Sequence, residues 1–105
     1  MPWHFYLLEF LAGAFLANSV PHCVNGISGA PFQTPFAKPP GIGESSPRVN
    51  VLWGFANLVA GLLLLHLFWP ENWGGWVVLA AGALALALAL QLSGHFGEVR
   101  AGKHN

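Results

Sequence analysis

Charged residues are what this sequence has least of. Only 8% of its 105 residues are charged, against about a quarter in ordinary soluble domains. A soluble chain of this length needs many more polar residues to cover its surface. The formal net charge is zero, so the basic footprint of a nucleic-acid-binding protein is missing. We therefore expect neither a soluble fold nor a nucleic-acid partner.

Cysteine and catalytic motifs are scarce as well. Cys23 is the single cysteine, which excludes an internal disulfide framework. The sequence has no serine elbow, no phosphate-binding glycine loop and no pair of acids at a defined spacing. His22 beside Cys23 is not a recognised metal-ligand spacing. We therefore expect no metal and no cofactor, and enzymatic activity stays uncertain, with the sequence favouring a non-enzyme.

Apolar residues, by contrast, make up 54% of the chain and gather in three long runs. The runs cover residues 3–20, 51–69 and 76–93, or about 27–29 Å each at helical rise. This matches the roughly 30 Å hydrocarbon core of a bilayer. Backbone polar groups in lipid must pair within their own segment, so the runs should be helices. The sequence predicts an all-α integral membrane protein with a single three-helix transmembrane domain over residues 1–105, surrounded by the lipid bilayer.

The expected helix bounds rest on breaking and capping residues beside the runs. Proline and glycine end helices, and a serine followed by proline is a common helix start. The residues used are Pro21, Ser46-Pro47, Pro70, Gly74-Gly75 and Gly94. They predict helices at about 3–20, 47–69 and 76–94.

Charge and tryptophan agree on the orientation of these helices. The first loop and the C-terminal tail hold all four Lys and Arg residues, and the N-terminus and second loop hold none. Under the positive-inside rule, the N-terminus is then outside and the C-terminus cytoplasmic, most simply in a bacterial inner membrane. An aromatic belt lies at the predicted outer ends of the helices. Its members are Trp3, Trp69, Trp73 and Trp76.

Residues 21–49 form a predicted long cytoplasmic loop, and residues 95–105 a cytoplasmic tail. The loop contains most of the prolines of the chain and several glycines, so neither helix nor sheet is expected there. Loops this long are usually either functional or disordered. A solvated linker is one interpretation. The other is a loop that packs across the cytoplasmic end of the bundle, or lies at the lipid surface, and so shelters Phe32, Phe36 and Ile42.

Glu9 is the first intramembrane candidate. An ionisable residue inside a span is a functional candidate because burying it unpaired is costly. Glu9 lies about 9 Å below the outer boundary at helical rise, on a face shared with Gly13 and Ala17. It is interpreted either as a proton or cation site, or as an interhelical hydrogen-bonding or snorkelling residue.

Further polar residues are candidates at both ends of the helices. His66 lies at a depth similar to that of Glu9, so the two could pair, but it faces roughly away from Asn57 on its own helix. Amides in membrane helices commonly join neighbouring helices, which is the plainer interpretation of Asn18 and Asn57. The cytoplasmic-boundary candidates are His22, Cys23, Asn50, Gln91 and His95.

Small residues at helical spacing indicate close packing of helices. Ala81, Ala85, Ala89 and Ser93 form one such ridge, and Gly54 and Gly61 form another with Asn57 between them. The leading hypothesis is therefore a small membrane protein that acts by assembling with other membrane helices, as an accessory subunit or a homo-oligomer. The alternative is a small oligomeric transporter or channel that uses Glu9. A third is a lipid-active enzyme with His22 near the headgroups.

Overall fold

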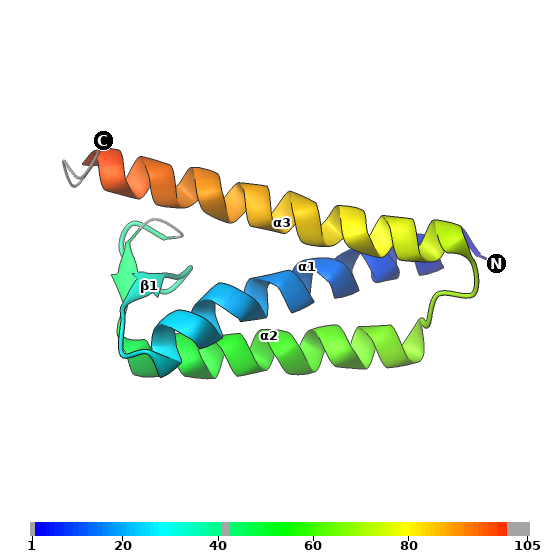
Figure 1. The fold of residues 1–105 in the computed structure, drawn as a ribbon, viewed down its shortest axis with the longest axis horizontal. Helices are drawn as coiled ribbons and strands as arrows, with labels where there is room; N and C mark the ends of the chain where they lie inside the picture. The colour runs from blue at the N-terminus through cyan, green and yellow to red at the C-terminus, as the bar shows by residue number, and fades with distance from the viewer. Residues whose placement is uncertain (1, 41–42, 101–105) are drawn as a thin grey trace.

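Three long helices make up most of the computed structural model, which describes the backbone of residues 2–40 and 43–100 and the side chains up to residue 94. They are α1 (Trp3–Ile27), α2 (Pro47–Leu67) and α3 (Trp73–Arg100). All three are long and apolar enough to cross a membrane, as predicted. Helix α1 lies between the other two (Figure 1) and packs against both, whereas α2 and α3 have little contact with each other.

The two ends of the bundle differ in character. At one end lie the start of α1, the end of α2 and the start of α3, with the tryptophans Trp3, Trp69, Trp73 and Trp76. We call it the tryptophan end. At the other end, residues 28–46 connect α1 to α2 (Figure 1). We call it the loop end.

Local capping sets the starts of α2 and α3. The Ser46 hydroxyl accepts a hydrogen bond from Val49 N, and Pro47 occupies the first helical turn, as predicted. Helix α3 begins at Trp73, three residues earlier than predicted, because Asn72 Oδ1 accepts from Gly75 N at 2.9 Å. The expected stop at Gly94 was wrong, since α3 continues to Arg100, and α2 ends at Leu67 rather than at residue 69.

Helix α1 does not stop at Pro21 as predicted. It continues to Ile27 with Pro21 inside it. The Asn25 side-chain amide donates to the Pro21 carbonyl at 2.7 Å, and the extra turns bury His22 and Gly26. Burial against the neighbouring helix outweighs the local cost of proline, which lacks the N–H that would bond the Ala17 carbonyl.

The connection between α1 and α2 is correspondingly shorter than the predicted loop 21–49, and it contains paired strands. Strand β1 (Phe32–Gln33) is antiparallel to β2 (Glu44–Ser45), with Phe32 opposite Ser45. The Gln33 amide donates to the Leu90 carbonyl on α3 at 2.9 Å. Gln33 and Thr34 are buried and Phe32 is half-buried, but Phe36 is 63% exposed, so the connection packs on the bundle without sheltering Phe36. Ile42 lies outside the described residues.

Glycines let the helices touch backbone to backbone. A Cβ on Gly13 would overlap the Leu79 carbonyl, and one on Gly82 would overlap the Phe10 carbonyl, so α1 and α3 meet at these two positions. On the other side of α1, a Cβ on Gly54 of α2 would overlap Cys23. Such close approach gains dispersion contacts in place of the hydrophobic driving force that lipid removes.

The alanine ridge of α3 faces away from these contacts. Ala81, Ala85 and Ala89 are exposed, and Ser93 is half-buried. The contact with α1 instead uses Gly75 and Gly82, which are both buried. The ridge is thus available to other helices or to lipid.

Candidate functional site

Glu9 of α1 is the most unusual side chain at the tryptophan end. It is 0% exposed. Neither carboxyl oxygen has a hydrogen-bond partner among the described residues. Glu9 Oε1 lies only 2.9 Å from where a Cβ on Gly75 would stand, and the Pro70 ring lies 2.8 Å from that same point. The carboxyl group therefore fills the space left by the missing side chain of Gly75.

The connection between α2 and α3 is held over this carboxyl group by Asn72. Its oxygen caps α3 at Gly75 N, and its amide nitrogen donates to the Tyr6 hydroxyl at 3.2 Å. Tyr6 lies one turn from Glu9 on α1. The cap therefore fixes the start of α3 relative to α1, and with it the position of Gly75 beside Glu9.

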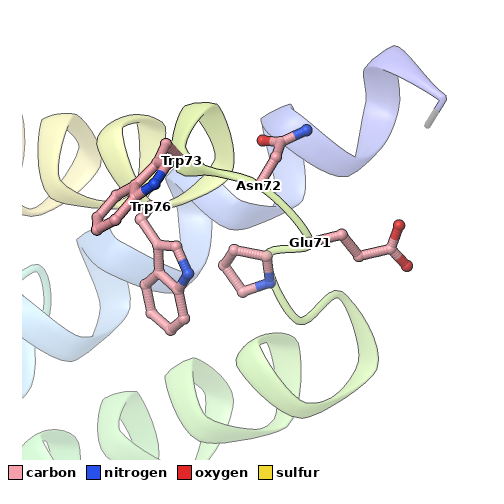
Figure 2. A pocket seen from close by; sticks show the side chains of 5 residues that line it. Glu71, Asn72, Trp73 and Trp76 are labelled. Carbon is pink, nitrogen blue, oxygen red and sulfur yellow. The ribbon is translucent and has the colours of Figure 1, made fainter.

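A cavity of about 500 Å³ opens at the same connection. Figure 2 shows Trp73 and Trp76 at the start of α3, with the Glu71 carboxylate pointing away from both indole rings. Trp76 also meets Trp69 edge to face, with ring centroids 5.2 Å apart. Pro70 lines this cavity and also borders the space that holds Glu9. The full lining is Pro70, Glu71, Asn72, Trp73 and Trp76.

The structure does not bring His66 to Glu9. His66 is exposed on α2, whereas the face of α2 that meets α1 carries the buried residues Asn50, Gly54, Asn57 and Gly61. The possible acid–imidazole pair is therefore not formed. The reason is geometric: His66 points roughly opposite to Asn57, and Asn57 is the residue that faces α1.

A second polar cluster lies toward the loop end, centred on His22. The ring is 1% exposed. Its Nδ1 lies 2.7 Å from Asn50 Oδ1, and its Nε2 lies 3.2 Å from Asn18 Oδ1. The amide of Asn18 donates to Asn57 Oδ1 at 2.9 Å. We call Asn18, His22, Asn50 and Asn57 the His22 network. It joins α1 to α2 through side chains alone.

Asn50 also fastens the loop to the helices. Its side-chain amide is 3.1–3.2 Å from the carbonyl oxygens of Phe32, Ser45 and Ser46. The Phe32 ring meets the His22 ring with centroids 5.3 Å apart, and Phe36 meets Trp53 at 4.9 Å. The loop thus covers the His22 network with aromatic rings.

The remaining predicted candidates are less engaged. Cys23 is half-buried and packs against Gly54 of α2. Gln91 is exposed on α3. His95 falls outside the residues whose side chains the structure describes. Within residues 2–40 and 43–94, no three His, Cys, Asp or Glu side chains gather in the way a metal site needs.

Several residues of both clusters were not expected from the sequence. Gln33 and Thr34 are buried in the loop, and Gly75 and Pro70 enclose Glu9. The Pro-Phe pairs at 31–32 and 35–36 flank Gln33 and Thr34, and they are the one local signal that this stretch packs against something.

Comparison of the chain with known protein families, curated proteins and solved structures finds no match.

Proposed function

We propose that this protein is a small oligomeric transporter or channel in which the Glu9 carboxyl group binds a proton or a small cation. One observation carries the proposal: Glu9 is fully buried among apolar helices, and both of its oxygens lack a partner among the described residues. An unpaired buried carboxylate is costly, and intramembrane ionisable residues commonly mark ion pathways. A bound cation supplies the missing partner, and a bound proton removes the charge.

The charge distribution supports a cation rather than an anion. The tryptophan end holds Glu9 and Glu71 and no Lys or Arg, so the local charge is negative. Clefts lined by one sign of charge concentrate the opposite ion. Glu71 is exposed and lines the cavity, and it directly follows Pro70, which borders the space that holds Glu9.

The same distribution supports an orientation. Lys38 and Arg48 lie at the loop end, and the last residues of α3 run toward that end (Figure 1). By the positive-inside rule the loop end is cytoplasmic and the tryptophan end is outside, in a bacterial inner membrane. Glu9 would then receive its ion from the outer side.

Assembly with other membrane helices is part of the proposal, because three helices are too few to enclose a pore. The exposed ridge of Ala81, Ala85 and Ala89 supports it, since small residues let a further helix approach closely. This ridge also favours a second candidate function, in which the chain is an accessory subunit and Glu9 is only structural.

Flux through proteoliposomes tests the role of Glu9. We expect cation or proton uptake driven by an imposed gradient, and we expect Glu9→Gln to reduce it by at least about tenfold, because the amide cannot carry the charge. The matched control is Glu44→Gln, the same substitution at an exposed carboxyl group in β2. Equal flux in Glu9→Gln and the unaltered protein, with both folded, would remove Glu9 from the mechanism and leave the accessory-subunit function.

A further inference from the structure

The His22 ring lies between two amide oxygens. Its Nδ1 is 2.7 Å from Asn50 Oδ1 and its Nε2 is 3.2 Å from Asn18 Oδ1. Both distances lie within hydrogen-bonding range for a nitrogen donor and an oxygen acceptor. A neutral imidazole has one N–H, and the imidazolium has two. How many hydrogens the site accommodates depends on whether either amide can turn its nitrogen toward the ring.

Asn50 cannot turn. Its Nδ2 lies 3.1, 3.2 and 3.1 Å from the carbonyl oxygens of Phe32, Ser45 and Ser46. Carbonyl oxygens only accept, so a flipped amide would place Asn50 Oδ1 against three acceptors. The side-chain oxygen of Asn50 therefore faces the ring, and His22 Nδ1 must carry a hydrogen to bond it.

Asn18 is fixed from the opposite side, through Asn57. The Asn57 Nδ2 donates to the Trp53 carbonyl at 2.7 Å, so Asn57 Oδ1 faces Asn18 and accepts from Asn18 Nδ2 at 2.9 Å. This leaves Asn18 Oδ1 facing His22 Nε2. If Asn18 alone is flipped, its oxygen faces Asn57 Oδ1. If both amides are flipped, Asn57 Oδ1 faces the Trp53 carbonyl. In each arrangement two acceptors still face each other.

The His22 network thus ends at backbone carbonyl acceptors on both sides. When the ring is neutral, the network has one donor hydrogen fewer than its contacts need. We propose that His22 is a proton-binding site, in which Nδ1–H is held by Asn50 and a second proton binds at Nε2 with Asn18 Oδ1 as its acceptor. The inference does not depend on Glu9, which lies at the tryptophan end of the same helix.

Among the residues whose side chains the structure describes, no opposite charge faces the ring. The groups that face the ring are the amides of Asn18 from α1 and Asn50 from α2, with the rings of Phe32 from β1 and Trp53 from α2 at 5.3 and 6.5 Å. The nearest titratable neighbour along α1 is Cys23, and Glu44 and Arg48 are exposed. Burial opposes the charge, and two hydrogen bonds from a charged donor favour it.

Loss of the proton affects the contact between α1 and α2. The neutral ring keeps its shorter bond to Asn50, so the loop stays fastened. The unprotonated Nε2 then faces Asn18 Oδ1, and this repulsion is relieved only by rotating Asn18 away from Asn57. Proton binding at His22 is therefore coupled to the Asn18–Asn57 hydrogen bond, the direct side-chain bond between α1 and α2 near the middle of the bundle.

Nitrogen NMR of ¹⁵N-histidine-labelled protein in lipid nanodiscs tests the proposal. The His22 signals are those lost in His22→Gln and retained in the control His66→Gln, which removes an exposed histidine. We expect two forms across a pH titration: an imidazolium with both nitrogens hydrogen-bonded, and a neutral ring with its hydrogen on Nδ1. Histidine tautomers follow their hydrogen bonds, so this neutral form is a direct consequence of the fixed Asn50.

Variants of Asn18 test the Nε2 site itself. Asn18→Asp keeps the shape and places a carboxylate at the acceptor, so proton affinity should rise by about tenfold or more; Asn18→Ala removes the acceptor, and the affinity should fall by a similar factor. The proposal is overturned by a neutral ring that carries its hydrogen on Nε2, by a ring that does not titrate while the protein stays folded, or by an Asn18→Asp midpoint equal to that of the unaltered protein. None of these outcomes bears on flux through Glu9.

Discussion

Single buried polar residues, rather than apolar ones, distinguish this bundle at the residue scale. The fully buried side chains include Glu9, His22, Thr34 and Asn50, whereas large apolar side chains are mostly exposed. A soluble protein shows the opposite arrangement. In lipid the outward apolar side chains are already in an apolar solvent, and the interior is where polar groups can find partners. Asn50 finds the most, since it binds the loop and His22 together.

Replacing Asn50 tests this role. Asn50→Ala should lower the free energy of unfolding by about 3 kcal/mol, because the carbonyl groups of Phe32, Ser45 and Ser46 and the ring of His22 each lose a hydrogen bond at once. Denaturant unfolding in mixed micelles, followed by tryptophan fluorescence, measures the change. The matched control is Asn25→Ala, which removes one bond to the Pro21 carbonyl and should cost about 1 kcal/mol or less. Equal losses in the two variants would show that the loop is not fastened by Asn50.

At the scale of the elements, α1 is the helix on which the others are built. It meets α3 through Gly13 and Gly82, and it meets α2 through Gly54, Gly61 and the His22 network. Because α2 and α3 hardly touch each other, each contact with α1 is needed to hold its helix in place. The glycines act through backbone proximity, so even one added methyl group separates the helices.

Gly82→Ala should therefore destabilise the bundle by about 2 kcal/mol, since the new Cβ overlaps the Phe10 carbonyl, which cannot move without moving α1. Unfolding in the same micelles checks it. Gly94→Ala serves as the control in the same helix, because its Cβ would meet only the Gln33 side chain, at 3.4 Å or more. Its effect should lie between neutral and about 1 kcal/mol of stabilisation, from helix propensity. A harmless Gly82→Ala would mean that α3 does not depend on this contact.

The elements also show where prediction from sequence succeeded. The start of α2 was predicted because Ser46 and Pro47 act within a single turn. The end of α1 was missed because the stop signal of Pro21 is local, whereas the burial of His22 and Gly26 depends on a helix that follows later in the chain. The strands were missed for the same reason: residues 32–33 pair with residues 44–45, and no short window contains both.

The candidate site divides in the same way. The sequence identified Glu9, His22 and Asn50 as candidates from their residue types and from their predicted depth in the membrane. That depth follows from hydropathy alone. It did not predict that Asn18 would bond Asn57 or that His66 would face away from Glu9. Those outcomes depend on how α2 is rotated about its axis, and this rotation is set by the packing of Gly54 and Gly61 against α1.

At the scale of the whole molecule the bundle is incomplete, because most of the surface of α3 is exposed. Helix α3 contacts α1 along a narrow strip, and its alanine ridge, Ala81, Ala85 and Ala89, is exposed. Lipid alone can cover such a surface, but small residues on a bare helix are also the typical contact between membrane helices. Copies of this chain that meet through α3 would form the oligomer that the proposed transporter or channel needs.

Disulfide crosslinking in membranes tests this assembly. With Cys23→Ser removing the native thiol, Ala85→Cys places a single cysteine on the alanine ridge, and Val59→Cys places one on the outward face of α2, where Val59 is 62% exposed. Oxidation should link copies of the Ala85→Cys protein into dimers at protein-to-lipid ratios where the Val59→Cys protein stays monomeric, because the ridge of small residues allows close backbone approach. Equal dimer yields would indicate random collision. If neither position gives a dimer, the chain is a monomer in lipid, and three helices cannot enclose a pore.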